Sequence, residues 1–247
     1  MRLDKFLTET AGVTRSEAKK KIKEKRVFVN GELARRPEQQ IEEETAQVYL
    51  DENRLVYCRY MYIMLHKPAG VVSATEDRRE RTVLDLLPTD MKKDIFPVGR
   101  LDKDTEGLLL LTNDGALAHQ LLSPKKHIDK LYFVRLEREI TKEDIEMFEK
   151  GLEITGEDGF IAKPAVLRSL TKEEEVTFGG EGFCAAVTIQ EGKFHQVKRM
   201  FQMVNNRVLY LKRMAMGALY LDETLKVGNY RVLTEQEIER LKYNVDK

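Results

Sequence analysis

The sequence feature that most constrains the fold is a run of four leucines, residues 108–111, that is ended by Asn113-Asp114-Gly115. The run is short and turn residues follow it at once, which favours a buried β-strand over a helix. The segment just before it, between Gly99 and Gly107, is crowded with polar and charged side chains. These are Arg100, Asp102, Asp104, Thr105 and Glu106. Charged residues in a loop anchored by a core strand make a plausible active-site arrangement.

On residue types alone, this loop has three interpretations: a carboxylate catalyst, a cation site or a solvated loop. A cation site would use Asp102, Asp104 and Glu106, but the segment lacks the spacing of a twelve-residue calcium loop. Arg100 and Lys103 also place positive charge among the candidate ligands. The cation site is therefore the least favoured interpretation, and the other two stay open at this point.

Beyond this segment, strands and helices interleave without a regular βαβ period. Short apolar runs predict further strands, and helical spacing of apolar residues predicts helices between them. The expected strands are 131–136, 185–189 and 208–211. The expected helices are 116–122, 142–150 and 196–204. We therefore predict an α+β fold with a mixed, mainly antiparallel sheet.

The first forty residues have a pattern of their own. Residues 3–7 carry apolar side chains at helical spacing, and Gly12 suits the end of that helix. Thr14-Arg-Ser-Glu17 is a capping box, which predicts the start of a second helix. Asn30-Gly31 then predicts a type I′ hairpin turn. Two short helices followed by a hairpin resemble the S4 RNA-binding domain, an αL-type unit.

This pattern predicts two domains, an S4-like RNA-binding domain over residues 1–58 and a second domain over residues 59–247. The stretch 42–51 is expected to serve partly as a linker, which would let the first domain move as a separate lobe.

Cysteine usage and hydropathy narrow the class of protein. The two cysteines, Cys58 and Cys184, lie far apart in the sequence, which excludes a disulfide framework or a thiolate metal cluster. No apolar run approaches the roughly 18–20 residues that a membrane helix needs. The N-terminus alternates charges and has no secretory apolar region, so we expect a cytoplasmic protein.

Charge is balanced over the whole chain, with 42 Lys+Arg and 42 Asp+Glu, but it is segregated along the sequence. Residues 1–36 hold eleven basic and five acidic residues, whereas residues 37–53 hold six acidic residues and no basic one. Residues 193–216 hold six basic residues and no acidic one. Two basic segments suit a polyanion, although two solvated faces would give the same pattern. The expected RNA-binding residues of the first segment are Arg2, Lys5, Arg15, Lys19, Lys20 and Lys23.

Four motifs follow one another along the chain. They are Lys67-Pro-Ala-Gly70, then Gly99-Arg-Leu-Asp102 with Asp104-Thr-Glu-Gly107-Leu-Leu, then Lys130-Leu-Tyr132-Phe-Val, and last Glu191-Gly-Lys-Phe-His-Gln-Val-Lys-Arg-Met-Phe201. Together they resemble the signatures of the pseudouridine synthases. The resemblance is strongest to the RsuA-like branch, which carries an N-terminal S4 domain and modifies ribosomal RNA. It spans nearly the whole chain, and residues 59–247 would be the catalytic domain.

The resemblance implies roles position by position. Asp102 would be the essential aspartate, Tyr132 the aromatic residue that stacks on the target base, and Lys198 the basic partner of Asp102. Arg100 would help to fill the gap left by a flipped-out uridine, and Leu211 would be an apolar wall of the pocket. Many relatives have arginine where this chain has lysine at 198, which fits the small-subunit branch but gives no forked, bidentate pair. The other expected substrate-binding residues are His195, Arg199 and Arg213.

Pseudouridine formation breaks the glycosidic bond, rotates the base and rejoins it through C5, so the resemblance implies no cofactor and no metal. The four histidines show no ligand spacing. His195 is expected to support the pocket or to contact RNA rather than to act as a general base. Asp102 would attack C1′ of the ribose or take a proton from C2′, and the sequence does not separate these routes. Lys198 would hold the carboxylate in place and keep it charged.

The late basic motif also bears on the substrate. His195-Gln-Val-Lys-Arg199 resembles the small-subunit enzymes, whereas enzymes for large-subunit RNA usually carry an Arg-Glu-Val-Arg-Arg type motif. The resemblance therefore implies one uridine of 16S ribosomal RNA, position 516 in the usual numbering of that RNA, in free RNA or a small-subunit assembly intermediate. The main alternative is a uridine of 23S ribosomal RNA.

Two other classes of function remain as alternatives. A non-catalytic RNA-binding protein of ribosome assembly would be expected to lack the aspartate, the tyrosine or the basic partner, and this chain has all three. A sugar-cleaving hydrolase would need a carboxylate pair and a water site, which nothing beyond Asp104 and Glu106 suggests. No heptads or large apolar helix faces demand a partner, so we expect a monomer.

Overall fold

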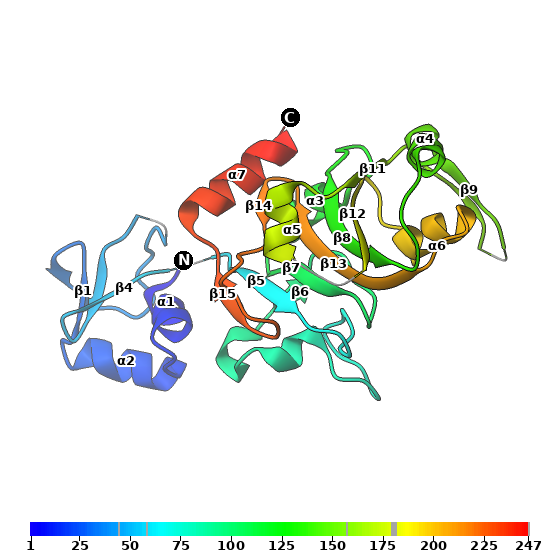
Figure 1. The fold of residues 1–247 in the computed structure, drawn as a ribbon. Coiled ribbons are helices and arrows are strands. Elements are labelled where there is room, and N and C mark those ends of the chain that lie inside the picture. Colours follow the sequence, from blue (N-terminus) through cyan, green and yellow to red (C-terminus); the bar gives the residue numbers. More distant parts are fainter. Residues whose placement is uncertain (44, 58, 157, 179–181, 247) are drawn as a thin grey trace. The chain divides into compact units, whose positions relative to one another are not determined.

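The computed structural model describes residues 1–246 except 44, 58, 157 and 179–181 (Figure 1). The chain divides into two compact units, Met1–Arg59 and Tyr60–Lys247, and each is described by itself. Cys58, one of the two cysteines considered above, lies outside the described residues. Within the part of the chain that is described, no helix has the length and apolar character to cross a membrane.

The first unit packs two helices on a small antiparallel sheet. Helices α1 (Leu3–Thr10) and α2 (Arg15–Lys23) precede strands β1 (Val27–Val29), β2 (Glu32–Leu33), β3 (Val48–Leu50) and β4 (Asn53–Leu55), which pair in the order β2-β1-β3-β4. The predicted capping box is confirmed, because Thr14 and Glu17 exchange hydrogen bonds at the start of α2. The predicted hairpin is also confirmed. Its residues Asn30 and Gly31 have φ of 52° and 83°, the left-handed values that a type I′ turn requires.

The stretch 42–51, which is expected to serve partly as a linker, contains a strand. Residues 48–50 form β3, which pairs with both β1 and β4. Val48 and Leu50 are buried in the core of the first unit, against residues of α1 and α2. The acidic side chains nearby hide this apolar alternation, which is only three residues long.

The second unit is built on one large sheet. Its strands are β5 (Tyr62–Lys67), β6 (Phe96–Pro97), β7 (Glu106–Thr112), β8 (Lys130–Leu136), β11 (Val166–Ser169), β12 (Phe183–Ile189), β13 (Val208–Met216), β14 (Leu219–Tyr220) and β15 (Tyr230–Val232). The main path runs β11-β12-β8-β13-β7-β5-β15, with β14 on β13 and β6 on β7. Among these pairs β7 and β13 are parallel and the others antiparallel. The predicted α+β class with a mixed, mainly antiparallel sheet is confirmed.

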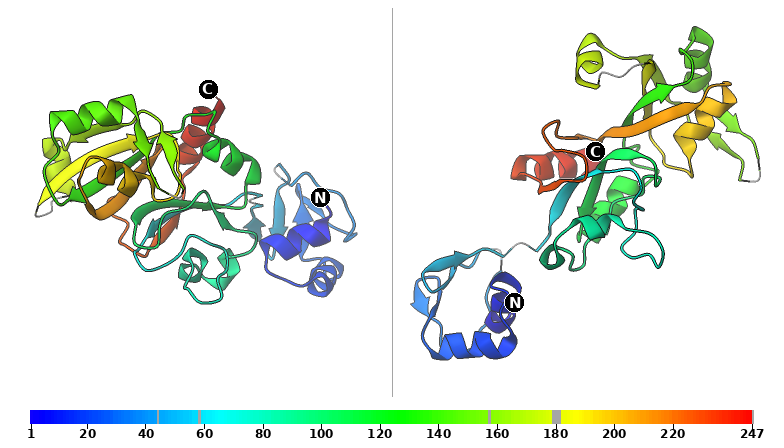
Figure 2. Two further views of the ribbon diagram at one scale, coloured as in Figure 1. Left: turned by 90° about the vertical axis from the view of Figure 1, so that its right-hand side faces the viewer. Right: turned by 60° about the horizontal axis from the view of Figure 1, so that its bottom comes forward.

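Helices cover both faces of this sheet. Helices α3 (Gly115–Leu122) and α7 (Glu235–Asp246) contribute to the apolar core on one face, where β5 and β7 supply Met64 and Leu108. Helices α4 (Lys142–Lys150) and α6 (Gln196–Met203) and the short 3-10 helix η1 (Val83–Leu86) contribute to the core on the other face. Helix α6 lies beside the hairpin of β9 (Leu152–Ile154) and β10 (Phe160–Ala162), and α4 lies beside β11 (Figure 2). The remaining described elements are η2 (Thr89–Met91) and α5 (Lys172–Phe178).

The parallel contact between β7 and β13 depends on a glycine. Gly107 of β7 lies opposite Arg213 of β13 and has φ of 106°, a backbone conformation that residues with a side chain rarely adopt. A Cβ atom on Gly107 would lie 2.2 Å from the carbonyl oxygen of Arg213. The two halves of the sheet therefore meet at a point where only glycine fits, directly after the charged loop.

Gly107→Ala tests this constraint. We expect it to destabilise the second unit by at least about 3 kcal/mol or to prevent folding, because both φ and the contact with Arg213 oppose a methyl group. Gly115→Ala is the matched control, since Gly115 begins α3 and a Cβ there meets nothing within 4 Å. Urea unfolding followed by circular dichroism measures both variants. Equal stability of the two would contradict the argument.

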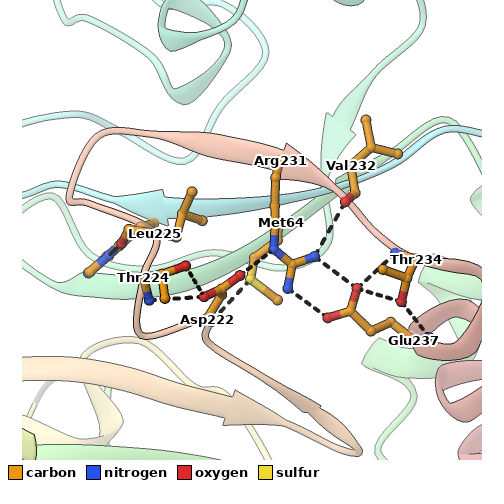
Figure 3. A network of polar contacts seen from close by, with 9 residues as sticks. Met64, Asp222, Thr224, Leu225, Arg231, Val232, Thr234 and Glu237 are labelled. Carbon is orange, nitrogen blue, oxygen red and sulfur yellow. Dashed lines mark hydrogen bonds and ion pairs between the residues drawn. The ribbon is translucent and has the colours of Figure 1, made fainter.

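An arginine ties the edge strand β15 to α7 (Figure 3). The Arg231 guanidinium donates to Asp222 at 2.7 Å and to both oxygens of Glu237 at 2.8 Å. Glu237 also accepts the backbone N–H of Thr234 at 2.8 Å, at the start of α7. The hydrogen bonds from Arg231 lower the pKa of Glu237 to about 2, against the opposing effect of burial.

This network makes the stability of the C-terminal segment depend on acid pH. Because its pKa is lowered in the folded state, the Glu237 carboxylate stabilises the folded protein fully above pH 4.5. This contribution is lost as the pH falls towards 2. We expect Arg231→Met to lower the free energy of unfolding by on the order of 1–2 kcal/mol at pH 7, a modest amount because the pair is partly solvated. The loss should shrink towards pH 2, because Glu237 becomes protonated there. Chemical unfolding at several pH values, with exposed Arg240→Met as control, measures the difference. A cost that does not depend on pH would refute the assignment.

Candidate active site

The loop between β6 and β7 carries Asp102, and hydrogen bonds with Ser73 hold the backbone of this loop. Buried Leu101 donates its N–H to the Ser73 hydroxyl oxygen at 3.0 Å, and the Ser73 hydroxyl donates to the Leu101 carbonyl at 2.9 Å. The Thr105 N–H then closes a turn on the Asp102 carbonyl at 3.1 Å. The Asp102 side chain, 25% exposed, therefore projects from a backbone that these hydrogen bonds hold in place.

A buried lysine fixes the same loop from the other side. Lys67, at the end of β5, is fully buried, and its ammonium donates to the carbonyls of Thr105 at 2.9 Å and Lys103 at 3.3 Å. It also donates to the carbonyl of Pro68 at 2.9 Å, and Gly70 N–H donates to Lys103. Burial lowers the pKa of Lys67 to about 8, although the negative charge of Asp104 and Asp102 opposes this. The Lys-Pro-Ala-Gly motif therefore positions the loop.

Lys198 of α6 meets two carboxylates of the loop. Its ammonium lies 3.1 Å from an Asp102 oxygen and 2.5 Å from an Asp104 oxygen. Burial opposes the charge of Lys198, but the hydrogen bonds to Asp104 and Asp102 outweigh it and raise the pKa of Lys198 above its ordinary 10.5. Likewise, burial of Asp104 is outweighed by Lys198, and the pKa of Asp104 is lowered. Lys198 is thus a permanent cation shared by both aspartates, and Asp104 is a partner that the sequence did not predict.

A cavity of about 50 Å³ lies at this point. Five of the residues expected at the site line this cavity and come from four parts of the chain, whereas Lys198 does not line it. They are Arg100, Asp102, Tyr132, His195 and Leu211, and Leu101, Thr105, Ile189, Gly192, Lys193, Gln196 and Val197 complete the lining. Tyr132 and Leu211 are 7% and 5% exposed, so they supply apolar surface next to the carboxylate.

The arrangement of Asp102, Lys198 and the cavity suits particular reactions. A carboxylate beside a fixed cation, in a small cavity that an aromatic ring also lines, suits attack on a sugar carbon or removal of a proton from one. Among the described residues, no group of three or more His, Cys, Asp or Glu side chains is placed to hold a metal ion.

Comparison with known proteins decides the family. The family model described as RNA pseudouridylate synthase matches residues 61–203, and the model of the S4 domain matches residues 1–46. The chain belongs to the pseudouridine synthase family. It is an RNA pseudouridine synthase with an S4 domain at its N-terminus.

Individual relatives agree. An uncharacterized RNA pseudouridine synthase of Bacillus subtilis is 46% identical over 242 residues, which cover 98% of each chain. The ribosomal small subunit pseudouridine synthase A of Escherichia coli is 40% identical over 239 residues, 96% of this chain and 98% of the relative. A crystal structure of a pseudouridylate synthase superposes with a TM-score of 0.66 at 37% identity, over 98% of this chain and 99% of that one.

Two residues expected to bind substrate in this synthase lie away from the cavity. The Arg199 guanidinium donates to the Thr155 carbonyl at 3.3 Å and stacks over the Phe160 ring. Arg213 is 2% exposed and donates to the Leu108 carbonyl at 2.8 Å, beside the parallel junction of β7 and β13. Arg213 therefore has a place in the sheet core, and neither residue lines the cavity.

The six expected RNA-binding residues of the S4 domain lie in or next to α1 and α2 and are exposed. Three of them pair with acidic neighbours: Arg2 with Asp4 at 2.7 Å, Lys5 with Glu9 at 3.7 Å and Lys20 with Glu24 at 3.9 Å. The two lysine pairs are exposed and weak, whereas Asp4 is buried and accepts two hydrogen bonds from Arg2. The others are Arg15, Lys19 and Lys23.

Lys67→Met tests how far the activity of the synthase depends on the hydrogen bonds from Lys67 to the loop backbone. We expect conversion of uridine to fall at least tenfold, because the carbonyls of Lys103 and Thr105 lose their donor and the Asp102 loop shifts. Activity is measured as pseudouridine formed in ribosomal RNA, with circular dichroism to establish that the variant folds. The control is Lys92→Met, whose partly exposed ammonium lies 3.7 Å from Asp85. Full activity of a folded Lys67→Met protein would contradict the assigned role.

Proposed function

We propose that this enzyme converts one uridine of 16S ribosomal RNA, position 516, to pseudouridine, with Asp102 as the catalytic carboxylate. The observation that carries the proposal is Asp102, which lines a cavity together with Tyr132 and Leu211 and pairs with Lys198 at 3.1 Å. The place of action would be the cytoplasm, and the substrate free RNA or a small-subunit assembly intermediate.

The reaction is an isomerisation in which every atom of the uridine is retained. Asp102 attacks C1′ of the ribose, or takes a proton from C2′ to give a glycal, and the bond from C1′ to N1 of the base breaks with its electrons on N1. The free uracil rotates, and C5 forms the new bond to C1′. C5 loses its proton and N1 gains one. The bond from Asp102 to C1′ breaks in the first route, and Asp102 returns its proton to C2′ in the second, so Asp102 is released unchanged in both. No electron acceptor or second substrate enters the balance.

The residues around Asp102 have separate roles in this reaction. Lys198 pairs with the Asp102 carboxylate at 3.1 Å and orients it, so that the carboxylate is in place before the substrate arrives. Tyr132 offers its ring to the extruded uracil, because a base buried in a duplex or stack cannot reach the carboxylate. Leu211 closes the apolar side, and exposed Arg100 lies at the cavity where it can occupy the space that the uridine leaves.

Two observations support the small-subunit target. The relative in Escherichia coli that is 40% identical over nearly its full length is named for the ribosomal small subunit. The chain also has His195-Gln-Val-Lys-Arg199 in place of the Arg-Glu-Val-Arg-Arg type of motif. The exposed cations of α1 and α2 suit phosphate contacts with RNA, and we propose that the enzyme acts as a monomer. A uridine of 23S ribosomal RNA is the second candidate.

Asp102→Asn tests the chemistry. We expect it to lower pseudouridine formation at least 10³-fold while RNA affinity stays within about threefold, because the amide keeps the shape but neither attacks nor accepts a proton. The matched control is Asp104→Asn, which lies in the same loop and shares Lys198. We expect this variant to keep more than a tenth of the activity.

The target is read by chemical mapping of pseudouridine in ribosomal RNA from a strain that lacks the gene. Loss of one 16S site, restored by the wild-type gene and not by Asp102→Asn, is the expected result. Loss of a 23S site instead would refute the target and retain the chemistry. Restoration by Asp102→Asn would refute the catalytic assignment.

A further inference from the structure

Phe194 is an exposed aromatic residue inside the basic segment that follows β12. It is 66% exposed, whereas its neighbours Gln196 and Val197 are buried. Its ring stacks on that of His195, with the ring centroids 3.8 Å apart and the planes 20° from parallel. One side of the ring is therefore covered, and the residue still offers most of its surface to solvent.

The backbone around Phe194 is rigidly built. The Gln196 side chain accepts the Lys193 N–H at 3.0 Å and donates to a Glu191 oxygen at 2.7 Å. The Gln196 N–H donates to the Lys193 carbonyl at 3.1 Å, which closes a turn across Phe194. The same Glu191 oxygen accepts the Lys163 N–H at 2.9 Å. His195 holds a left-handed conformation with φ of 50°, so the stacked pair is presented in one fixed geometry.

Phe194 lines a second cavity, of about 310 Å³, that adjoins the Asp102 cavity and shares six lining residues with it. The shared residues are Arg100, Leu101, Asp102, Gly192, Lys193 and His195. Besides these, Val72, Ser73, Lys103 and Phe194 line the second cavity. Its charged lining residues are three cations and Asp102, which suits a phosphate backbone running past the carboxylate.

We propose that the Phe194 ring is a stacking platform for a nucleobase next to the target uridine, held in this second cavity. The inference rests on the proposed function. The smaller cavity next to Tyr132 and Asp102 receives the extruded uracil. A neighbouring base, unstacked when the uridine leaves, lies against the free surface of Phe194, because single-stranded RNA is commonly bound by stacking its bases on aromatic side chains. The His195 ring backs the platform from the other side.

The proposal is tested by a double-mutant cycle between protein and RNA. The RNA is a fragment of 16S ribosomal RNA around the modified uridine, with one flanking nucleotide at a time replaced by an abasic ribose. Binding is measured in an Asp102→Asn background, so that no turnover occurs. We expect Phe194→Ala to weaken binding of the intact RNA about tenfold, since a stacked base contributes roughly 1–3 kcal/mol.

In the Asp102→Asn parent, one abasic position should lower the affinity about tenfold. In the Phe194→Ala variant the same position should lower it less than twofold. Such a difference indicates a direct contact between Phe194 and the missing base. Phe194→Tyr should bind as the parent does, and Phe194→Leu, which keeps apolar area but no flat ring, should behave as Phe194→Ala. The control is Phe183→Ala, an exposed aromatic at the opposite end of β12 from the cavity-lining Ile189, and its affinity should stay within twofold.

Three results would overturn the proposal. They are additive losses at every abasic position, parent-like binding by Phe194→Leu, and Phe194→Ala binding within twofold of the parent. Because the cycle measures binding alone, failure of the wild-type enzyme to convert uridine would refute the proposed function without deciding this inference. If the RNA does not bind at all, both fall together.

Discussion

The close approach of β7 to β13 is the contact on which the rest of the second unit depends. It joins a group of antiparallel strands on the β13 side to another on the β7 side, through a short parallel register centred on Gly107 and Arg213. The backbones are so close there that a single methyl group has no room. Because the loop that carries Asp102 enters β7 at this junction, the geometry that closes the sheet also sets the position of the carboxylate.

Two positive charges also help to position the Asp102 loop. Two lysines serve the Asp102 loop in different ways: Lys67 is fully buried and donates to backbone carbonyls, whereas Lys198 is partly exposed and pairs with side-chain carboxylates. Burial depresses the pKa of Lys67, and the two aspartates raise that of Lys198. One cation holds the backbone of the loop in shape, and the other pairs with the carboxylates of Asp102 and Asp104. The residues around Asp102 are therefore organised without RNA, and under the proposed function this spares the reaction that reorganisation.

Much of the fold could be predicted because it depends on local patterns. The helix at 142–150 and the strand at 131–136 follow from apolar periodicity and capping. Strand β13 was predicted to end at Leu211 but runs to Met216, because Lys212 and Arg213 interrupt the apolar pattern while Arg213 is buried. At the site, the pairing of Asp104 with Lys198 joins residues 94 positions apart, and the acceptors of Lys67 are backbone carbonyls, which leave no mark in a sequence. A lysine at the end of an apolar strand, directly before proline, was the available signal.

The cavity wall has a consequence for the time at which activity appears during synthesis. Its members come from the β6–β7 loop, β8, the end of β12, the β12–α6 loop, the start of α6 and β13, so the site is made of contacts between residues distant in the chain. Such contacts form late, because each requires closure of a long loop. A nascent chain that has left the ribosome only as far as α6 holds Asp102 and Lys198 but lacks β13, the strand between β8 and β7. The cavity wall is thus complete only after β13 has inserted between β8 and β7.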